Sequence, residues 1–284
     1  PYFMSNKDLL ESVKKLRELT GVGFKDCKLA VDESNNNIEK AIEFLRKKGI
    51  AKASNKMSRT ASEGLCLLHE KDGKVSLIEI NSETDFVAKN KEFISFCKEV
   101  SEINFKNKAD LLKVNKSLMK NNLTVETNLI DLIAKIGEKI TIRRANFFDN
   151  KSGENSLYIH GAIESKIGKI VSIVKTSKKN SDDVGKKIAM HISALSPMGL
   201  DEKDLSKDII EKEIEIIKAE LLNSGKQLEM IEKITKGKIN KFISENTLVN
   251  QVWIMDSKKK VSDILKENDI KILDFIRYKV GEGV

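Results

Sequence analysis

The chain has 284 residues, of which 40% are hydrophobic and 33% are charged. A single hydrophobic core stops growing at about this size, so we expect two or three domains. No run approaches the roughly 18 consecutive apolar residues that a membrane-spanning helix needs, and no basic-then-apolar signal sequence follows Met4. We therefore expect a cytoplasmic protein that has no membrane partner.

The formal net charge is +8 at pH 7. An excess of lysine is a feature of nucleic-acid-binding proteins, but here the lysines are interspersed with acids, which favours a solvated ionic surface. The three cysteines, Cys27, Cys66 and Cys97, are far apart and form no Cys-x-x-Cys pair. We interpret them as small buried apolar side chains in a reducing compartment.

Residues 4–50 are predicted to form three short helices, because apolar side chains recur at helical spacing in each of them. Gly21-Val22-Gly23 separates the first two helices, and Asn37 is predicted to cap the third. Gly49 stands where a C-terminal cap is expected, and residues 51–60 are predicted to be a linker, either irregular or helical. A module this small should lean on a partner or on the rest of the chain.

The first half of the core is predicted at residues 61–148. Strands at 64–70 and 75–81 flank Asp72-Gly73, a strong hairpin signal. A helix at 92–103 follows, then two more helical stretches, of which the second ends at Gly137, and a strand at 139–148.

The second half of the core, residues 149–199 and 246–284, repeats the order of hairpin, helix and late strand. Strands are predicted at 157–163, 169–175 and 270–280, with a helix at 183–195. The fold class is therefore α+β, with antiparallel sheets in a two-part core.

Residues 200–245 are predicted to be an inserted antiparallel helical hairpin. Residues 201–220 carry eight acids and four lysines, whereas residues 226–241 carry two acids and five lysines. An acidic arm would thus lie beside a basic arm, an arrangement that specifies orientation. The hairpin is either a charged spacer or an arm for docking or dimerisation.

Motifs for enzyme chemistry are absent. There is no Gly-x-x-x-x-Gly-Lys-Ser/Thr loop and no Gly-x-Gly-x-x-Gly after a strand. His69, His160 and His191 lie in different elements without a second ligand nearby, so no metal site is expected. The sequence predicts a protein that is not an enzyme and that needs no cofactor.

One loop stands apart, because Asp85 is followed there by two apolar side chains, Phe86 and Val87. In one interpretation Asp85 caps a helical turn and Phe86 packs on the core. In the other, Phe86 is an exposed anchor for a partner protein. Composition alone leaves both open.

The segment Thr84-Asp85-Phe86-Val87-Ala88-Lys89 resembles the signature of the elongation factor Ts family. Further segments match the family's pattern in order along nearly the whole chain: Leu16-Arg17-Glu18-Leu19-Thr20-Gly21-Val22-Gly23, Asp26-Cys27-Lys28, Ala41-Ile42-Glu43, Ile136-Gly137-Glu138, Ile142-Arg143-Arg144, Tyr158-Ile159-His160-Gly161, Ile188-Ala189-Met190-His191-Ile192, Phe275-Ile276-Arg277 and Gly281-Glu282-Gly283.

The resemblance implies a ubiquitin-associated-like module at the N-terminus and guanine-nucleotide exchange on elongation factor Tu. It implies that the chain associates with the GDP-bound and the nucleotide-free partner, displaces the partner's magnesium ion and promotes GDP release, without binding nucleotide itself. Several family members continue beyond the position of Gly283 with a further helix that grips the partner. Whether the hairpin forms a homodimer in the complex stays open.

The resemblance also implies roles for individual residues. Phe86 is the wedge, Val87 supports it, Asp85 offers polar contacts and Thr84 shapes the turn. His160 is expected to contact the partner's nucleotide domain. Val22 and Gly23 are expected to add a docking surface.

A ribosome- or RNA-associated protein is the alternative. It rests on the net charge and on Arg46-Lys47-Lys48, with Lys52, Lys56 and Arg59 nearby.

Overall fold

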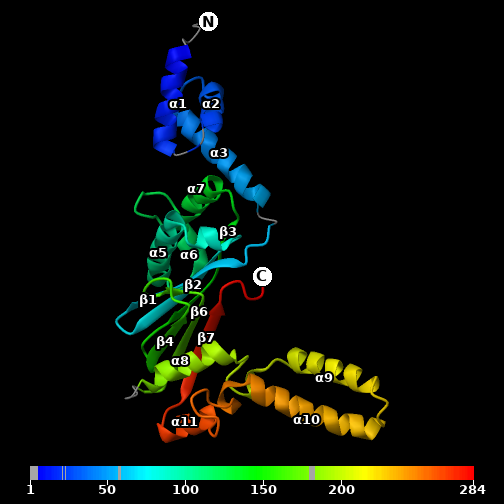
Figure 1. The fold of residues 1–284 in the computed structure, drawn as a ribbon. Helices are drawn as coiled ribbons and strands as arrows, with labels where there is room; N and C mark the ends of the chain where they lie inside the picture. Colours follow the sequence, from blue (N-terminus) through cyan, green and yellow to red (C-terminus); the bar gives the residue numbers. More distant parts are fainter. Residues whose placement is uncertain (1–5, 21, 23, 57–58, 179–182) are drawn as a thin grey trace. The chain divides into compact units, whose positions relative to one another are not determined.

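The computed structural model describes residues 6–20, 22, 24–56, 59–178 and 183–284. It has the predicted α+β composition, with three N-terminal helices and two antiparallel sheets (Figure 1). Its first compact unit contains Pro1–His69, Ser76–Phe147 and Val280–Val284, and its second contains Glu70–Val75 and Phe148–Lys279. Over the described ranges, no helix is long and apolar enough to cross a bilayer.

The N-terminal helices are α1 (Asn6–Thr20), α2 (Phe24–Glu33) and α3 (Ile38–Lys56). They share a buried core of Val13, Leu16, Cys27, Ala30, Val31, Ala41 and Leu45. The predicted cap of α3 is confirmed, since the amide of Lys40 donates to Asn37 Oδ1 at 2.9 Å. The predicted turn is described at Val22, whereas Gly21 and Gly23 lie outside the described residues.

The prediction that Gly49 caps α3 is wrong, because the helix continues to Lys56. The predicted linker therefore begins as helix. Gly49 faces α7 (Val125–Ile136), where a Cβ atom would already lie 3.4 Å from Ala134 Cβ. A Cβ atom would make only ordinary van der Waals contact with α7, so Gly49 is an interior residue of α3 and not a helix end.

The first sheet contains the strands β1 (Glu63–Lys71), β2 (Lys74–Ser82) and β3 (Ile140–Phe148), with β2 between the other two. The predicted hairpin is confirmed, and both Asp72 (φ 53°) and Gly73 (φ 74°) adopt left-handed conformations. Gly137 ends α7 as predicted, in a left-handed conformation with φ 86°.

The helices of this half are α4 (Asp85–Ala88), α5 (Lys91–Lys106), α6 (Leu111–Lys116) and α7. The α5 helix packs on the sheet through an apolar face that includes the fully buried Phe93 and Cys97. Asn104 in α5 also donates to the backbone oxygen of Leu77 in β2. Strand β2 is thereby held on one side by a helix, so the loop that follows it starts from a fixed end.

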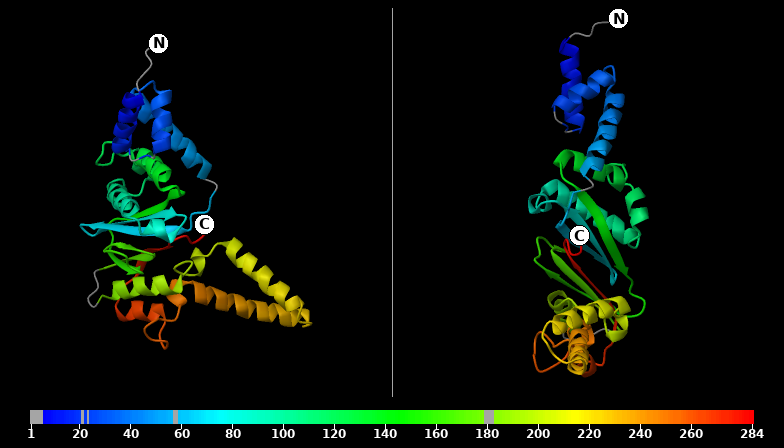
Figure 2. Two further views of the ribbon diagram at one scale, coloured as in Figure 1. Left: turned by 45° about the horizontal axis from the view of Figure 1, so that its top comes forward. Right: turned by 90° about the vertical axis from the view of Figure 1, so that its right-hand side faces the viewer.

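In the second unit the sheet order is β4-β6-β7, and both pairings are antiparallel. Its strands and helices are β4 (Glu154–His160), β5 (Ile167–Gly168), β6 (Ile170–Thr176), α8 (Val184–Leu195), α11 (Val261–Glu267) and β7 (Ile272–Lys279). Helix α8 packs against β4 and β6 (Figure 2). The α11 helix was not predicted from the sequence.

His191 lies in the core of the second unit. Its Nε2 atom is 3.0 Å from Gln251 Oε1, and its ring stacks on Trp253 with centroids 5.2 Å apart. Burial lowers the pKa of His191, while the hydrogen bond with Gln251 raises it by less. These contacts give this histidine a structural role.

Helices α9 (Lys207–Leu222) and α10 (Leu228–Asn246) run side by side (Figures 1 and 2), after the 3-10 turn η1 (Glu202–Asp204) and before η2 (Leu248–Asn250). They share an apolar cluster of Ile217, Leu221, Ile231, Ile239 and Ile243, which Leu205 joins from the segment before α9. All of residues 200–246 are described, and within them no ion pair joins the acidic arm to the basic arm. Apolar packing, rather than charge pairing, holds the two arms together.

A buried ionic cluster surrounds Glu79 in the first unit. The carboxylate accepts from Arg144 Nε (2.6 Å), Arg143 Nη1 (3.2 Å), the amide of Gly281 (2.8 Å) and Asn81 Nδ2 (2.9 Å). Burial raises the pKa of Glu79, but the Gly281 amide, the Asn81 side chain and Arg144 together lower it below its usual value. One fully buried carboxylate therefore joins β2, β3 and the C-terminal segment.

We expect Glu79→Gln to lower the free energy of unfolding by about 3 kcal/mol at pH 7, because two arginines lose their buried counter-charge. Since folding lowers the pKa of Glu79, its contribution is complete above the unfolded value of about 4.3 and is lost as the pH falls through the lower folded value. Urea unfolding of both proteins between pH 7 and pH 3 measures this. A stability difference that does not narrow in acid would contradict the assignment.

Candidate functional site

The four-residue helix α4 forms the tip of the loop that follows β2. Thr84 is its N-cap, with extended backbone (φ −121°, ψ 156°), and Thr84 Oγ1 accepts from the amide of Val87 at 3.4 Å. Threonine is a favoured residue at this position, and an acidic residue such as Asp85 suits the first turn. The sequence thus encodes a capped turn at a point where the chain leaves the sheet.

The turn separates its apolar side chains. Val87 and Ala88 are buried, with 8% and 0% exposure, whereas Phe86 is 80% exposed. The interpretation that Phe86 packs on the core is therefore wrong. Asp85 is not the cap either, since it is the first helical residue and pairs with Lys89 at 2.9 Å.

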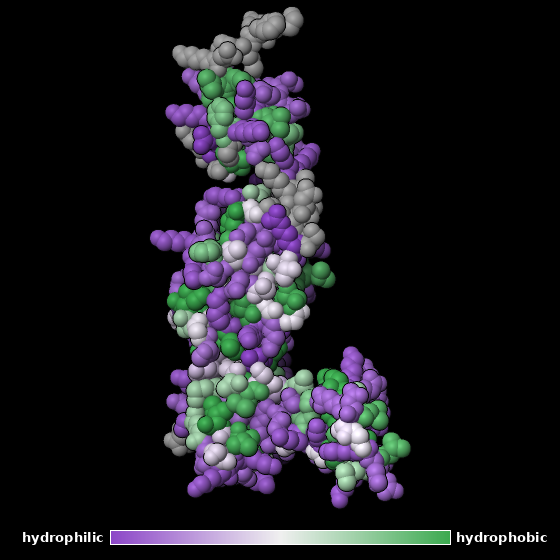
Figure 3. Space-filling model, turned by 45° about the vertical axis from the view of Figure 1, so that its right-hand side comes forward, coloured by the Kyte–Doolittle hydropathy of each residue, from purple (hydrophilic) through white to green (hydrophobic). Residues whose placement is uncertain are grey.

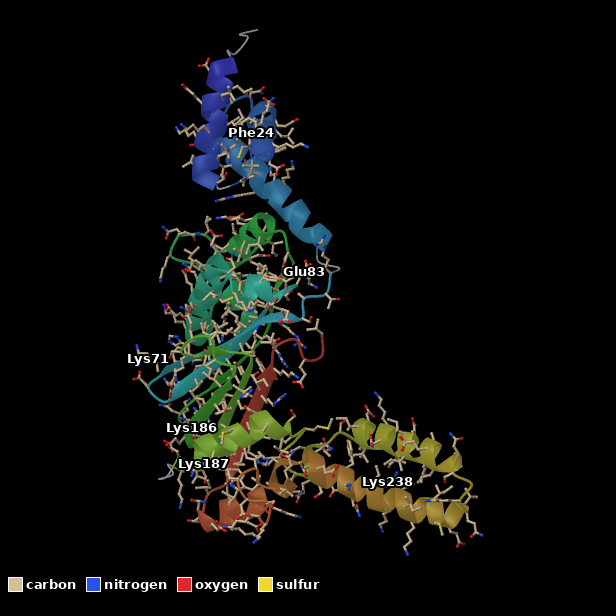
Figure 4. The ribbon with its side chains drawn as sticks, in the orientation of Figure 1. Phe24, Lys71, Glu83, Lys186, Lys187 and Lys238 are labelled. Atoms are coloured by element: carbon tan, nitrogen blue, oxygen red, sulfur yellow. The ribbon has the colours of Figure 1, made fainter. Side chains whose placement is uncertain are left out.

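Two carboxylates brace the start of this turn. Glu138 accepts from the hydroxyl of Thr84 at 2.8 Å and from its amide at 3.1 Å. Glu83, labelled in Figure 4 where the chain leaves the first sheet, accepts from the amide of Lys139 at 2.6 Å and pairs with Arg59 at 3.5 Å. The segments 83–84 and 138–139 are therefore joined by three hydrogen bonds.

The far end of the turn is also fixed. Asn90 caps α5, and its Oδ1 atom accepts from the amides of Glu92 (2.9 Å) and Phe93 (3.2 Å). The amide of Asn90 in turn donates to the backbone oxygen of Val87 at 2.9 Å. Phe86 thus projects from a backbone that is hydrogen-bonded on both sides.

The remaining predicted site residues lie elsewhere. His160 is exposed at the end of β4 in the second unit, with its ring 6.5 Å from that of Tyr158. Val22 is half-buried in the three-helix module, where its backbone oxygen accepts from Cys27 Sγ at 3.4 Å. Gly23 lies outside the described residues. Of the predicted site residues that the structure describes, Thr84 to Val87 lie together, in α4 and its N-cap.

The bracing residues Glu83, Glu138 and Lys139 were missed as site residues by sequence reasoning. The pattern Ile136-Gly137-Glu138 marked a helix end, but Glu138 meets Thr84 across 54 positions of the chain. Helical spacing and turn signals report only near neighbours, so they carry no signal for this contact.

A large exposed aromatic side chain on a hydrogen-bonded turn is the typical form of an interface anchor. In the part of the chain that the structure describes, no group of three His, Cys, Asp or Glu side chains is arranged to hold a metal ion. Such a turn is typical of a protein that binds another protein.

The family model described as Elongation factor TS matches residues 83–282. The elongation factor Ts of Mycoplasmoides gallisepticum is 40% identical over 278 residues, covering 97% of this chain and 94% of its own length. Those of Psychrobacter arcticus and Spiroplasma citri are each 39% identical, over 96% of this chain and 90% and 92% of their own lengths. The chain belongs to the elongation factor Ts family. It is a nucleotide-exchange factor for elongation factor Tu and not an enzyme.

We expect Phe86→Ala to change the free energy of unfolding by less than about 0.5 kcal/mol, because the side chain is exposed. Val87→Ala is the matched control on the same turn. It removes buried methyl groups and should cost roughly 2 kcal/mol. Urea unfolding measures both, and a larger loss from Phe86→Ala than from Val87→Ala would show that the aromatic ring packs on the core.

Proposed function

We propose that this chain speeds GDP release by inserting Phe86 into elongation factor Tu beside the magnesium site of that partner. The observation that carries the proposal is the 80% exposure of Phe86 on a turn whose backbone is hydrogen-bonded at both ends. An anchor that is already positioned loses little conformational entropy when it inserts, so more of its contact energy is available for binding.

Each residue of the turn then has a distinct role. Phe86 is the wedge, and the buried Val87 beneath it ties the turn to the core. Thr84 caps the turn through its hydroxyl. Asp85 offers polar contacts next to the wedge, and its ion pair with Lys89 is solvent-exposed, so it exchanges readily for a partner group.

Insertion weakens nucleotide binding indirectly. The wedge displaces the partner residues that orient the water ligands of the magnesium ion, and the ion leaves. Without it the β-phosphate of GDP loses its main counter-charge. Because the coupling is reciprocal, factor and GDP weaken each other's binding by the same free energy, and GTP binding to the empty partner releases the factor.

Other surfaces of the chain are proposed to contact elongation factor Tu as well. His160 contacts the nucleotide domain of the partner, and its exposure at the end of β4 supports this. The ubiquitin-associated-like module at residues 4–50 docks through Val22 and Gly23. The other proposed domains are a linker at 51–60, a first core half at 61–148, a second core half at 149–199 and 246–284, and the helical hairpin at 200–245. We propose that the protein is cytoplasmic.

The α9–α10 hairpin is proposed to be a docking or dimerisation arm rather than a spacer. Leu222 and Leu228, which flank its turn, are 62% and 72% exposed. Apolar side chains also stand among charged ones on the hairpin surface in Figure 3. These exposed leucines are available for contact with a partner protein or with a second copy of this chain.

We expect Phe86→Ala to slow factor-stimulated GDP release about thirtyfold, the effect of losing an interface hot spot. The measurement is release of a fluorescent GDP analogue from purified elongation factor Tu. Leu112→Ala is the matched control, because Leu112 is a large apolar side chain in α6 that is 76% exposed. Release that is unchanged by Phe86→Ala, or slowed equally by Leu112→Ala, would contradict the wedge.

A further inference from the structure

The orientation of Phe86 cannot come from its own helix. Helix α4 has four residues, and a single turn is not stable in water by itself. Phe86 is 80% exposed, so packing around its ring does not hold it either. The direction of the side chain must be set by the groups that fix the backbone of the turn.

Thr84 is the residue through which the turn is fixed, and Glu138 determines how it acts. A hydroxyl group has one proton and two lone pairs. In Thr84 that proton is directed to Glu138 at 2.8 Å, which leaves a lone pair for the amide of Val87 at 3.4 Å. The second carboxylate oxygen of Glu138 accepts from the Thr84 amide at 3.1 Å. Glu138 therefore fixes both the backbone and the hydroxyl rotation of the cap.

Glu138 is itself held in place. It follows Gly137, whose left-handed conformation ends α7 and whose amide donates to the backbone oxygen of Ile133 at 2.9 Å. The next amide, that of Lys139, donates to Glu83 at 2.6 Å. The end of α7 is thus linked to the start of α4 by hydrogen bonds in both directions.

We propose that Glu138 is a positioning residue for nucleotide exchange. It touches neither nucleotide nor metal, and it acts through Thr84 to hold Phe86 in the direction required for insertion. This inference rests on the proposed function of Phe86. Thr84 to Val87 cannot fill this role alone, because without the Glu138 carboxylate the hydroxyl proton of Thr84 has no fixed direction.

The test is a double-mutant cycle with Glu138→Gln, Phe86→Ala and the combination. Glutamine has nearly the same size but carries no charge, so the hydrogen bonds to Thr84 lose their charge assistance, and the amide N–H group cannot accept the Thr84 hydroxyl proton. We expect Glu138→Gln to lower the maximal rate of GDP release at saturating factor about tenfold. On the Phe86→Ala background the same change should have no further effect, because there is no ring left to position.

Two more variants separate positioning from folding. Thr84→Val removes the hydroxyl and should reproduce the effect of Glu138→Gln. Glu92→Gln is the matched control, since Glu92 forms an exposed 2.7 Å ion pair with Lys135 and should leave exchange unchanged. Thermal unfolding of each variant shows that the rates are compared between folded proteins.

The inference is overturned if Glu138→Gln leaves the maximal rate intact, or if it lowers the rate by the same factor with and without Phe86. In both cases a full effect of Phe86→Ala would leave the proposed function standing. If Phe86→Ala itself has no effect, the wedge and the positioning role fail together.

Discussion

The position of an exposed side chain is set by its backbone, and this constraint governs the candidate site. Phe86 has almost no neighbours of its own, so every interaction that directs it is made by the residues before and after it. The hydrogen bonds between Thr84 and Glu138 span 54 positions of the chain, and the one between the Lys139 amide and Glu83 spans 56. These hydrogen bonds fix the backbone of the short turn that carries Phe86.

The rest of the first unit holds Thr84 and Glu138 in place. Strand β2 delivers Thr84, while α7 and its left-handed Gly137 deliver Glu138 at the start of β3. The cluster around Glu79 ties β2 to β3 through Arg143 and Arg144, next to the same strands. Two segments that match the family pattern, Ile136-Gly137-Glu138 and Ile142-Arg143-Arg144, thus have a structural role. They stabilise the strands and the helix end that support the turn.

Local signals in the sequence predicted much of the fold. Asp72-Gly73 predicted the hairpin because two consecutive residues there adopt positive φ, and Gly137 predicted a helix end for the same reason. The same rule failed at Gly49, because a glycine inside a helix has the same appearance in a sequence as one that ends a helix. Contacts across many residues, such as Glu138 with Thr84 or Gln251 with His191, were not predictable. Composition left two interpretations of Phe86 open, because a phenylalanine beside a valine is compatible with a buried or an exposed position. The exposed fraction of the side chain in the structure decided between them.

The proposed mechanism has this chain act on GDP through the magnesium ion of elongation factor Tu. The most direct test compares the acceleration of GDP release by this chain in excess magnesium and after chelation of the metal. We expect a large acceleration with magnesium and little beyond the faster intrinsic rate without it, because the step that the wedge promotes has then already occurred. An equal acceleration under both conditions would contradict a mechanism that works through the metal.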